Sequence, residues 1–253
     1  MLDQTVDPVF DHSWIPSSAW QCLQFPKLSK LAQENADFLD DVPVMSATVL
    51  GLEMLLNESC IDLRKASELV LSDVGATIQT LRLVGRDYDF AADLPCRMGD
   101  CIASLDLGTW FCAMSARTFG FDGQHAAATA FWKHGRVVAQ YAQLVAESLD
   151  RIPPENAYLV GLLHEVGAIP KVLGWSDGVS GISGSAATSA IEGSLPLFVL
   201  AAIRSVNDRC ASSIWKFILN AAHELAGVRT DCNESALDDI QYMGTVHAEQ
   251  NAA

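Results

Sequence analysis

The chain has 253 residues, a formal net charge of −15 and a hydrophobic content of 50%. This length and apolar content are ample for a real hydrophobic core and do not demand more than two structural lobes. The acidic charge is spread along the chain without a cluster of Lys or Arg. Such a surface repels phosphate backbones and anionic lipid headgroups, so we expect neither nucleic acid nor a membrane surface as a partner.

The first residues and the cysteines indicate where the protein works. Residues 1–7 carry acids where a secretory signal needs positive charge, and no apolar stretch follows them. No apolar run approaches the ~20 residues needed to span a bilayer. The seven cysteines are an odd number without a CxxC pair, which is typical of reduced, apolar cysteines. We therefore expect a cytoplasmic protein.

The first predicted elements are an N-terminal extension and three helices. Residues 1–40 mix aromatic residues, prolines and acids without a clear period, and are interpreted as an extension that packs through its aromatic residues. A helical pattern follows, in which Ser46 is expected to cap a helix that ends near Asn57. Asp62 and Asp73 are expected to cap the next two helices.

The second half opens with the longest predicted helix, at residues 126–149, whose apolar side chains recur at helical spacing. A Pro-Pro pair then sets the start of a helix at 155–166, which Gly167 ends. The stretch 174–194 is rich in Gly, Ser and Ala and is predicted to be loop-like. Two more helices and a polar tail complete the chain, at residues 196–206, 212–226 and 227–253.

Strand signals are scarce throughout, so the predicted fold class is all-α. A change of pattern near residues 120–126 indicates a hinge. On this interpretation the chain forms a two-lobed helical bundle, with one lobe at residues 41–120 and the other at 121–226.

Three histidines lie inside strongly helical segments, among apolar neighbours: His134, His164 and His223. Glu165 follows the second of them directly. Imidazoles and a carboxylate are ligands of Fe, Mn and Zn, and helical bundles build metal sites from side chains on separate helices. Spacing alone favours the alternative, in which three unrelated histidines fill the core or cap helices, with His223 complementing a helix C-terminus.

Two motifs carry a family resemblance: Phe131-Trp-Lys-His134-Gly-Arg-Val-Val-Ala and Gly161-Leu-Leu-His164-Glu165-Val-Gly167, with thirty positions between the two histidines. Together they resemble the HDOD family, the HD-related output domain of bacterial signalling proteins, which is related to the HD metal-dependent phosphohydrolases. The resemblance covers residues 41–226 and implies an HD-domain/phosphodiesterase-like helical fold. Further similar stretches are Asp41-Val-Pro-Val, residues 62–73, residues 102–108 and the Leu195-Pro196 helix.

The resemblance also implies a set of metal ligands. His134 stands where an HD site has its first metal-binding histidine, and His164 with Glu165 stands at the His-Asp pair. His223 stands where HD hydrolases place their last aspartate. The implied cofactor is a divalent metal ion, Fe, Mn or Zn, at a degenerate site.

The departures from the HD pattern argue against catalysis. Glutamate at 165 is one methylene longer than aspartate, and histidine at 223 makes the site less negative. Ala168 stands where active HD enzymes tend to have lysine, so a cation for a phosphate group is missing. The stretch 174–194, where HDOD relatives often carry another histidine, contains none. We therefore expect that phosphohydrolase activity has been lost.

The favoured function is a non-catalytic signal-transduction output domain that binds a partner protein or a small signalling ligand between its lobes. The alternative is a metal-dependent phosphohydrolase or cyclic-dinucleotide phosphodiesterase, in which an acid such as Asp177 or Asp208 assists water. A third possibility is that the histidines only fill the core. Trp132 is a candidate for stacking against a ligand in the groove between the lobes, although a core anchor is the commoner role of such a residue.

Overall fold

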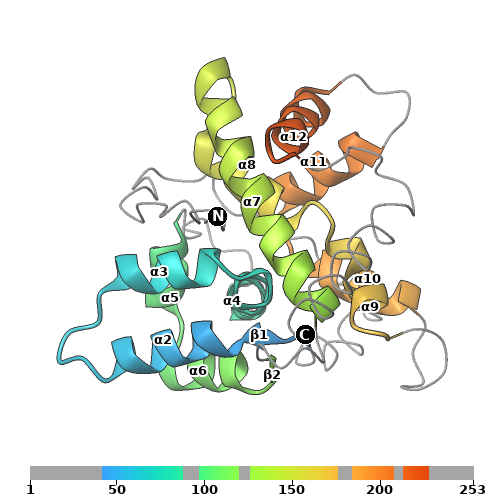
Figure 1. Cartoon of the computed structure of the whole chain (residues 1–253). Helices are drawn as coiled ribbons and strands as arrows, with labels where there is room; N and C mark the ends of the chain where they lie inside the picture. The colour runs from blue at the N-terminus through green and yellow to red at the C-terminus, as the bar shows by residue number, and fades with distance from the viewer. Residues whose placement is uncertain (1–41, 88–96, 120–125, 176–183, 208–212, 228–253) are drawn as a thin grey trace, which may run out of the picture.

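The computed structural model describes residues 42–87, 97–119, 126–175, 184–207 and 213–227 (Figure 1). The N-terminal extension at 1–40 and nearly all of the hinge at 120–126 and of the polar tail at 227–253 lie outside these residues. Within them, the predicted all-α fold is confirmed, apart from one short pair of strands. No helix among the described residues combines the length and the apolar character needed to cross a bilayer.

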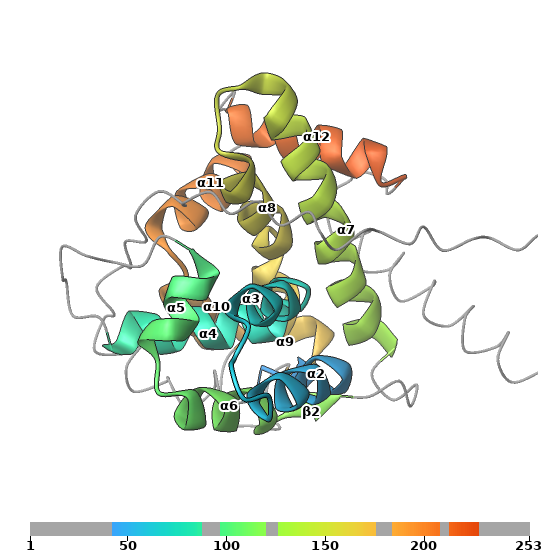
Figure 2. The same ribbon diagram turned by 90° about the vertical axis from the view of Figure 1, so that its left-hand side faces the viewer.

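The described elements form two lobes. The N-terminal lobe contains β1 Val44–Met45, α2 Ser46–Leu56, α3 Leu63–Leu71, α4 Val74–Asp87, α5 Met98–Ser104, α6 Leu107–Ser115 and β2 Thr118–Phe119. The C-terminal lobe contains α7 Ala126–Leu149, α8 Pro154–Leu163, the 3-10 helix η3 Val166–Ala168, α9 Ile169–Val172, α10 Gly184–Gly193, α11 Leu197–Asn207 and α12 Ile214–Leu225. The long α7 runs diagonally between the two groups in Figure 1, and the turned view places α2 and α6 at the opposite end of the molecule from α11 and α12 (Figure 2).

Two of the three predicted helix caps are confirmed. The Asp62 carboxylate accepts hydrogen bonds from the Arg64 and Lys65 amides at the start of α3. The Asp73 carboxylate accepts one from the Ala76 amide at the start of α4. Each bond satisfies an amide that has no partner within its helix.

The prediction that Ser46 caps α2 is wrong. Met45 takes the capping position without a side-chain hydrogen bond, and Ser46 is the first residue of the helix. The Ser46 hydroxyl donates instead to the carbonyl of Phe119, at 3.0 Å. This contact exists because β1 pairs with β2 in parallel, with Val44 opposite Thr118, a pairing between distant segments that no local pattern indicated.

The prediction of a loop at 174–194 is also wrong for the second half of this stretch, where α10 forms. Alanine has the highest helix propensity, and small side chains allow a helix to pack closely. Ala187, Ala190 and Ile191 of α10 are all at most 3% exposed, so the burial of this face stabilises a helix that its Gly and Ser content concealed.

The pair α7 and α8 forms the frame of the C-terminal lobe. The two helices approach closely at Gly161, where an added Cβ would lie 2.7 Å from the Cα of Ala139 and 3.0 Å from the Cβ of Ala142. The absence of a side chain at Gly161 therefore sets the spacing between the two helices. This spacing matters because each helix carries a candidate site residue.

We expect Gly161→Ala to destabilise the protein by about 1–3 kcal/mol, because the new methyl group meets backbone atoms that cannot move away. The helix propensity of alanine offsets only about 1 kcal/mol of this strain. Gly108→Ala in α6 is the matched control, since its Cβ would meet nothing closer than 3.5 Å. Chemical denaturation of the two variants checks the difference, and equal stability of both would contradict the close approach.

Candidate metal centre

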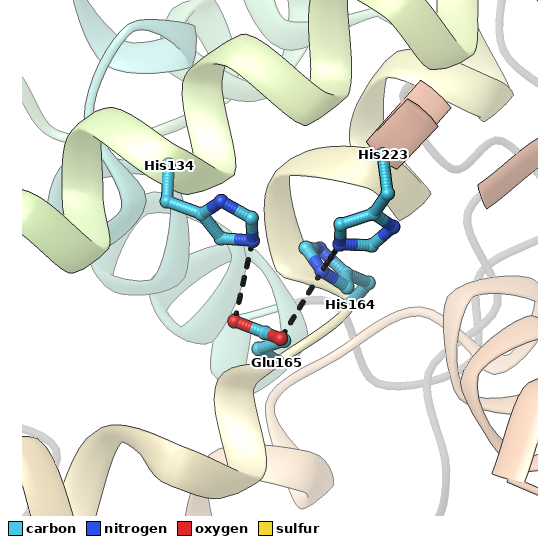
Figure 3. A group of neighbouring side chains, drawn as sticks. All are labelled: His134, His164, Glu165 and His223. Carbon is cyan, nitrogen blue, oxygen red and sulfur yellow. Dashed lines mark hydrogen bonds and ion pairs between the residues drawn. The ribbon is translucent and has the colours of Figure 1, made fainter. Parts of the chain in front are cut away.

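The four residues expected to bind a metal come together from three helices (Figure 3). His134 lies in the first half of α7, His164 is the C-cap residue directly after α8, and His223 lies in the last turn of α12. Glu165 follows His164 directly. Residues separated by up to 89 positions in the chain therefore share one place in the C-terminal lobe.

The ligand atoms of this cluster are close to one another. The Nε2 atoms of His164 and His223 lie 3.1 Å apart. The two carboxylate oxygens of Glu165 lie 3.5 Å from Nε2 of His134 and 3.6 Å from Nε2 of His164. Taking one ligand atom from each residue, all four lie within 4.8 Å of one another.

The backbone explains how the Glu165 carboxylate reaches two of the histidines. Helix α8 ends at Leu163, and Glu165 has φ −111° and ψ 20°, outside the helical conformation. Its side chain leaves the chain from a turn rather than from the helix surface. From this position the Glu165 carboxylate reaches between His134 and His164.

The cluster is largely removed from water. The side chains of His134 and His164 are 9% and 6% exposed, and His223 is 3% exposed. Glu165, at 23%, is the most exposed of the four. Interactions among charges are stronger here than at the surface, and an uncompensated charge is correspondingly costly.

Backbone carbonyls determine which nitrogens of two rings carry hydrogen. Nδ1 of His164 lies 2.7 Å from the carbonyl oxygen of Gly161, and Nδ1 of His223 lies 2.8 Å from that of Leu219. A carbonyl oxygen only accepts, so each Nδ1 must donate, and each Nε2 of a neutral ring carries a lone pair. The two lone pairs then face each other at 3.1 Å. Such a contact is repulsive unless a proton or a cation lies between the two atoms.

The surroundings favour the neutral form of His134 and His223 and the charged form of Glu165. Burial lowers the pKa of His134 to about 4, against the opposing effect of the Glu165 charge. Burial also lowers the pKa of His223, as does the charge that His164 can carry. Burial alone would raise the pKa of Glu165, but the neighbouring imidazoles of His164, His134 and His223 lower it to about 2. These three side chains can thus bind a metal without first losing protons.

The donor set fits a divalent transition metal. Three imidazole nitrogens and one carboxylate oxygen suit Zn, Fe or Mn better than Mg, which prefers oxygen ligands and bound water. With metal–ligand distances of about 2.0–2.2 Å, tetrahedral ligand atoms lie about 3.4 Å apart. The separations of 3.1, 3.5 and 3.6 Å between these ligand atoms surround that value. Among the described residues, this is the cluster of His, Cys, Asp and Glu side chains that could hold a metal ion.

The remaining candidates have other positions. Trp132 is 1% exposed and donates from Nε1 to the Asp73 carboxylate at 2.9 Å, with Phe119 packed edge-on against its ring. This is the arrangement of a core anchor, which leaves no ring face for stacking on a ligand. Asp177 and Asp208, the acids considered for the alternative function, lie outside the described residues. Sequence reasoning treated Asp73 only as a cap and missed its bond to Trp132, because nothing local indicates a contact across 59 positions.

Residues 105–193 match the family model of the HDOD domain. The resemblance found in the sequence is confirmed over this segment, which includes His134, His164 and Glu165 and ends before His223. No protein of curated function matches the chain.

The fold is similar to that of the MmoQ response regulator from Methylococcus capsulatus strain Bath. The structure of its fragment 20–298 is 15% identical, with a TM-score of 0.55 over 81% of this chain and 91% of that chain. A second MmoQ structure is 14% identical, with a TM-score of 0.56 over 79% and 92%. An HDOD domain protein of unknown function from Geobacter sulfurreducens is 21% identical over 82% of this chain and 83% of that chain, with a TM-score of 0.32.

We expect the metal-free protein to lose stability as the pH falls from about 6.5 to about 4. In this window the unfolded chain takes up a proton at His134, whereas the folded protein keeps that ring neutral, so stability must decrease with decreasing pH. A shift of this size corresponds to roughly 3 kcal/mol between the two ends of the window. Denaturation curves at several pH values measure it.

The matched pair for this measurement is His134→Gln and Lys133→Gln. The first removes the titrating group, and its unfolding free energy should vary less with pH than that of the unchanged protein. The second alters the exposed neighbour and leaves the ring at position 134 in place. An unaltered pH dependence in His134→Gln would show that this ring does not titrate as described.

Proposed function

We propose that the chain is a regulatory output domain of a signalling system. In this proposal it binds a partner protein or a small signalling ligand, and its C-terminal lobe holds one divalent transition metal ion without hydrolysing a phosphoester. The observation that carries the proposal is the pair of Nε2 atoms of His164 and His223, 3.1 Å apart with both Nδ1 atoms committed to carbonyl groups. A cation is the simplest group that makes this contact favourable.

The regulatory part of the proposal is supported by the comparisons. The match to the HDOD domain covers the helices that carry three of the four cluster residues. The MmoQ structures, which share the fold, are those of a response regulator. The acidic net charge of −15 is compatible with a protein partner or a small ligand and unfavourable for nucleic acid.

The composition of the cluster favours a structural ion over a catalytic one. Four protein ligands around one ion are typical of closed, structural sites, whereas catalytic zinc sites commonly keep three and leave a position for water. His223, where HD enzymes have aspartate, makes the ligand set less negative. Ala168 offers no cation for a phosphate group. Among the described residues, no second group of His, Cys, Asp and Glu side chains could hold another ion.

A bound ion would supply the positive charge that the two facing lone pairs require. Around it, the chain's own residues would act as links between helices. His134 would tie α7 to the site, His164 and Glu165 the end of α8, and His223 the last turn of α12. The ion would thus stabilise the relative positions of the three helices that build the C-terminal lobe.

We expect freshly purified protein to contain close to one equivalent of Zn, Fe or Mn, measured by elemental analysis. Removal of the metal by a chelator should lower the melting temperature by about 10 °C, if the ion is present at about a thousand times its dissociation constant. His164→Ala should bind no metal and show no response to the chelator. A chelator response retained in His164→Ala would place the metal elsewhere.

We expect the metal-loaded protein to show no turnover of nucleotides or cyclic dinucleotides. The physical reason is the closed ligand set without a phosphate-binding cation at position 168. Product analysis by chromatography after long incubation is the measurement. Turnover that is present in the unchanged protein and absent in His164→Ala would instead establish the phosphohydrolase.

A further inference from the structure

A single corner of the N-terminal lobe receives hydrogen bonds from two of the three helices that lead to the metal cluster, α7 and α8. The corner consists of Leu71, Ser72, Asp73 and Val74, between α3 and α4. Trp132 of α7 donates from Nε1 to Oδ1 of Asp73, at 2.9 Å. Tyr158 of α8 donates from its hydroxyl to the carbonyl oxygen of Leu71, at 2.9 Å.

Hydrogen bonds from several elements of the N-terminal lobe hold the corner in place. Asp73 is fully buried, and its carboxylate also accepts from the Met45 amide at 2.8 Å, the Ala76 amide at 3.1 Å and the Thr48 hydroxyl. These donors belong to β1, α2 and α4, so the Asp73 side chain links three elements of the N-terminal lobe. The carbonyl of Val70, beside the corner, accepts from the Asp73 amide and from the Thr77 hydroxyl. A displacement of the corner would therefore displace the lobe with it.

The donors of these two hydrogen bonds lie on α7 and α8, the helices that lead to His134 and His164. Trp132 and His134 are two residues apart on α7, and at about 100° per residue they point to nearly opposite sides of the helix. Tyr158 precedes His164 by six residues on α8. Next to His134, an added Cβ at Gly135 would lie 3.0 Å from the carbonyl oxygen of Leu162 and 3.3 Å from Val74, so α7, α8 and the corner are in contact at this level.

We propose that the 71–74 corner couples the occupancy of the metal cluster to the docking of the N-terminal lobe. This inference rests on the proposed metal site. An ion that fixes α7 and α8 relative to each other also fixes Trp132 and Tyr158 in the spacing that the corner requires. By reciprocity, a lobe docked at the corner strengthens metal binding by the same factor. The metal cluster thereby regulates the arrangement of the two lobes.

The test measures zinc affinity of the full chain by competition with a chromogenic chelator. Trp132→Phe and Tyr158→Phe each delete one interlobe hydrogen bond and are expected to weaken zinc binding about tenfold, within the usual range of such couplings. Trp110→Phe is the matched control. Trp110 is equally buried, and its Nε1 donates to Thr80 at 2.9 Å, entirely inside the N-terminal lobe. The zinc affinity of Trp110→Phe is expected to stay unchanged, although this variant also loses stability.

Hydrogen exchange gives the second readout. Zinc is expected to slow hydrogen exchange in α3 and α4 of the unchanged protein, which carry none of the proposed ligands, and to slow it less in Tyr158→Phe. Equal zinc affinity in all three variants, with protection confined to α7, α8 and α12, would overturn the coupling and leave the metal site standing. Failure of the unchanged protein to bind zinc would overturn the metal site and the coupling together.

Discussion

The account depends on one contact, the approach of two imidazole nitrogens that both carry lone pairs. Nε2 of His164 and Nε2 of His223 lie 3.1 Å apart, while backbone carbonyls of their own helices occupy both Nδ1 atoms. A pair of unrelated core histidines has no reason to adopt this orientation, because either ring could relieve the repulsion by turning. Here each ring is fixed by a carbonyl within its own helical turn. The geometry is that of ligands arranged for a shared cation.

This contact also organises the rest of the molecule. The ligands come from α7, from the end of α8 and from α12, so the site draws together the helices of the C-terminal lobe. On its far side α7 presents Trp132 to Asp73, the buried carboxylate at the centre of the N-terminal lobe. Glu165 in one lobe and Asp73 in the other thus each contact a side chain of the same helix, α7.

Much of the fold could be predicted from the sequence, because local signals determine most of it. The helix at 126–149 was predicted with the boundaries that α7 has, since its apolar period is long and regular. Asp62 and Asp73 were identified as caps because capping is a short-range hydrogen bond. The prediction failed where partners are distant in the chain: β1 pairs with β2 across 74 residues, and this pairing removed Ser46 from its expected capping role. In α10, burial of a small-residue face outweighed a composition typical of loops.

The candidate site was predictable in its members but not in its geometry. Helical context and family resemblance identified His134, His164, Glu165 and His223, yet only the folded chain shows that Glu165 reaches two histidines from a turn beyond α8. X-ray absorption at the zinc edge of the zinc-loaded full chain measures the central claim most directly. The account expects three imidazole nitrogens and one carboxylate oxygen at about 2.0–2.2 Å. A shell of oxygen atoms with at most one imidazole would contradict it.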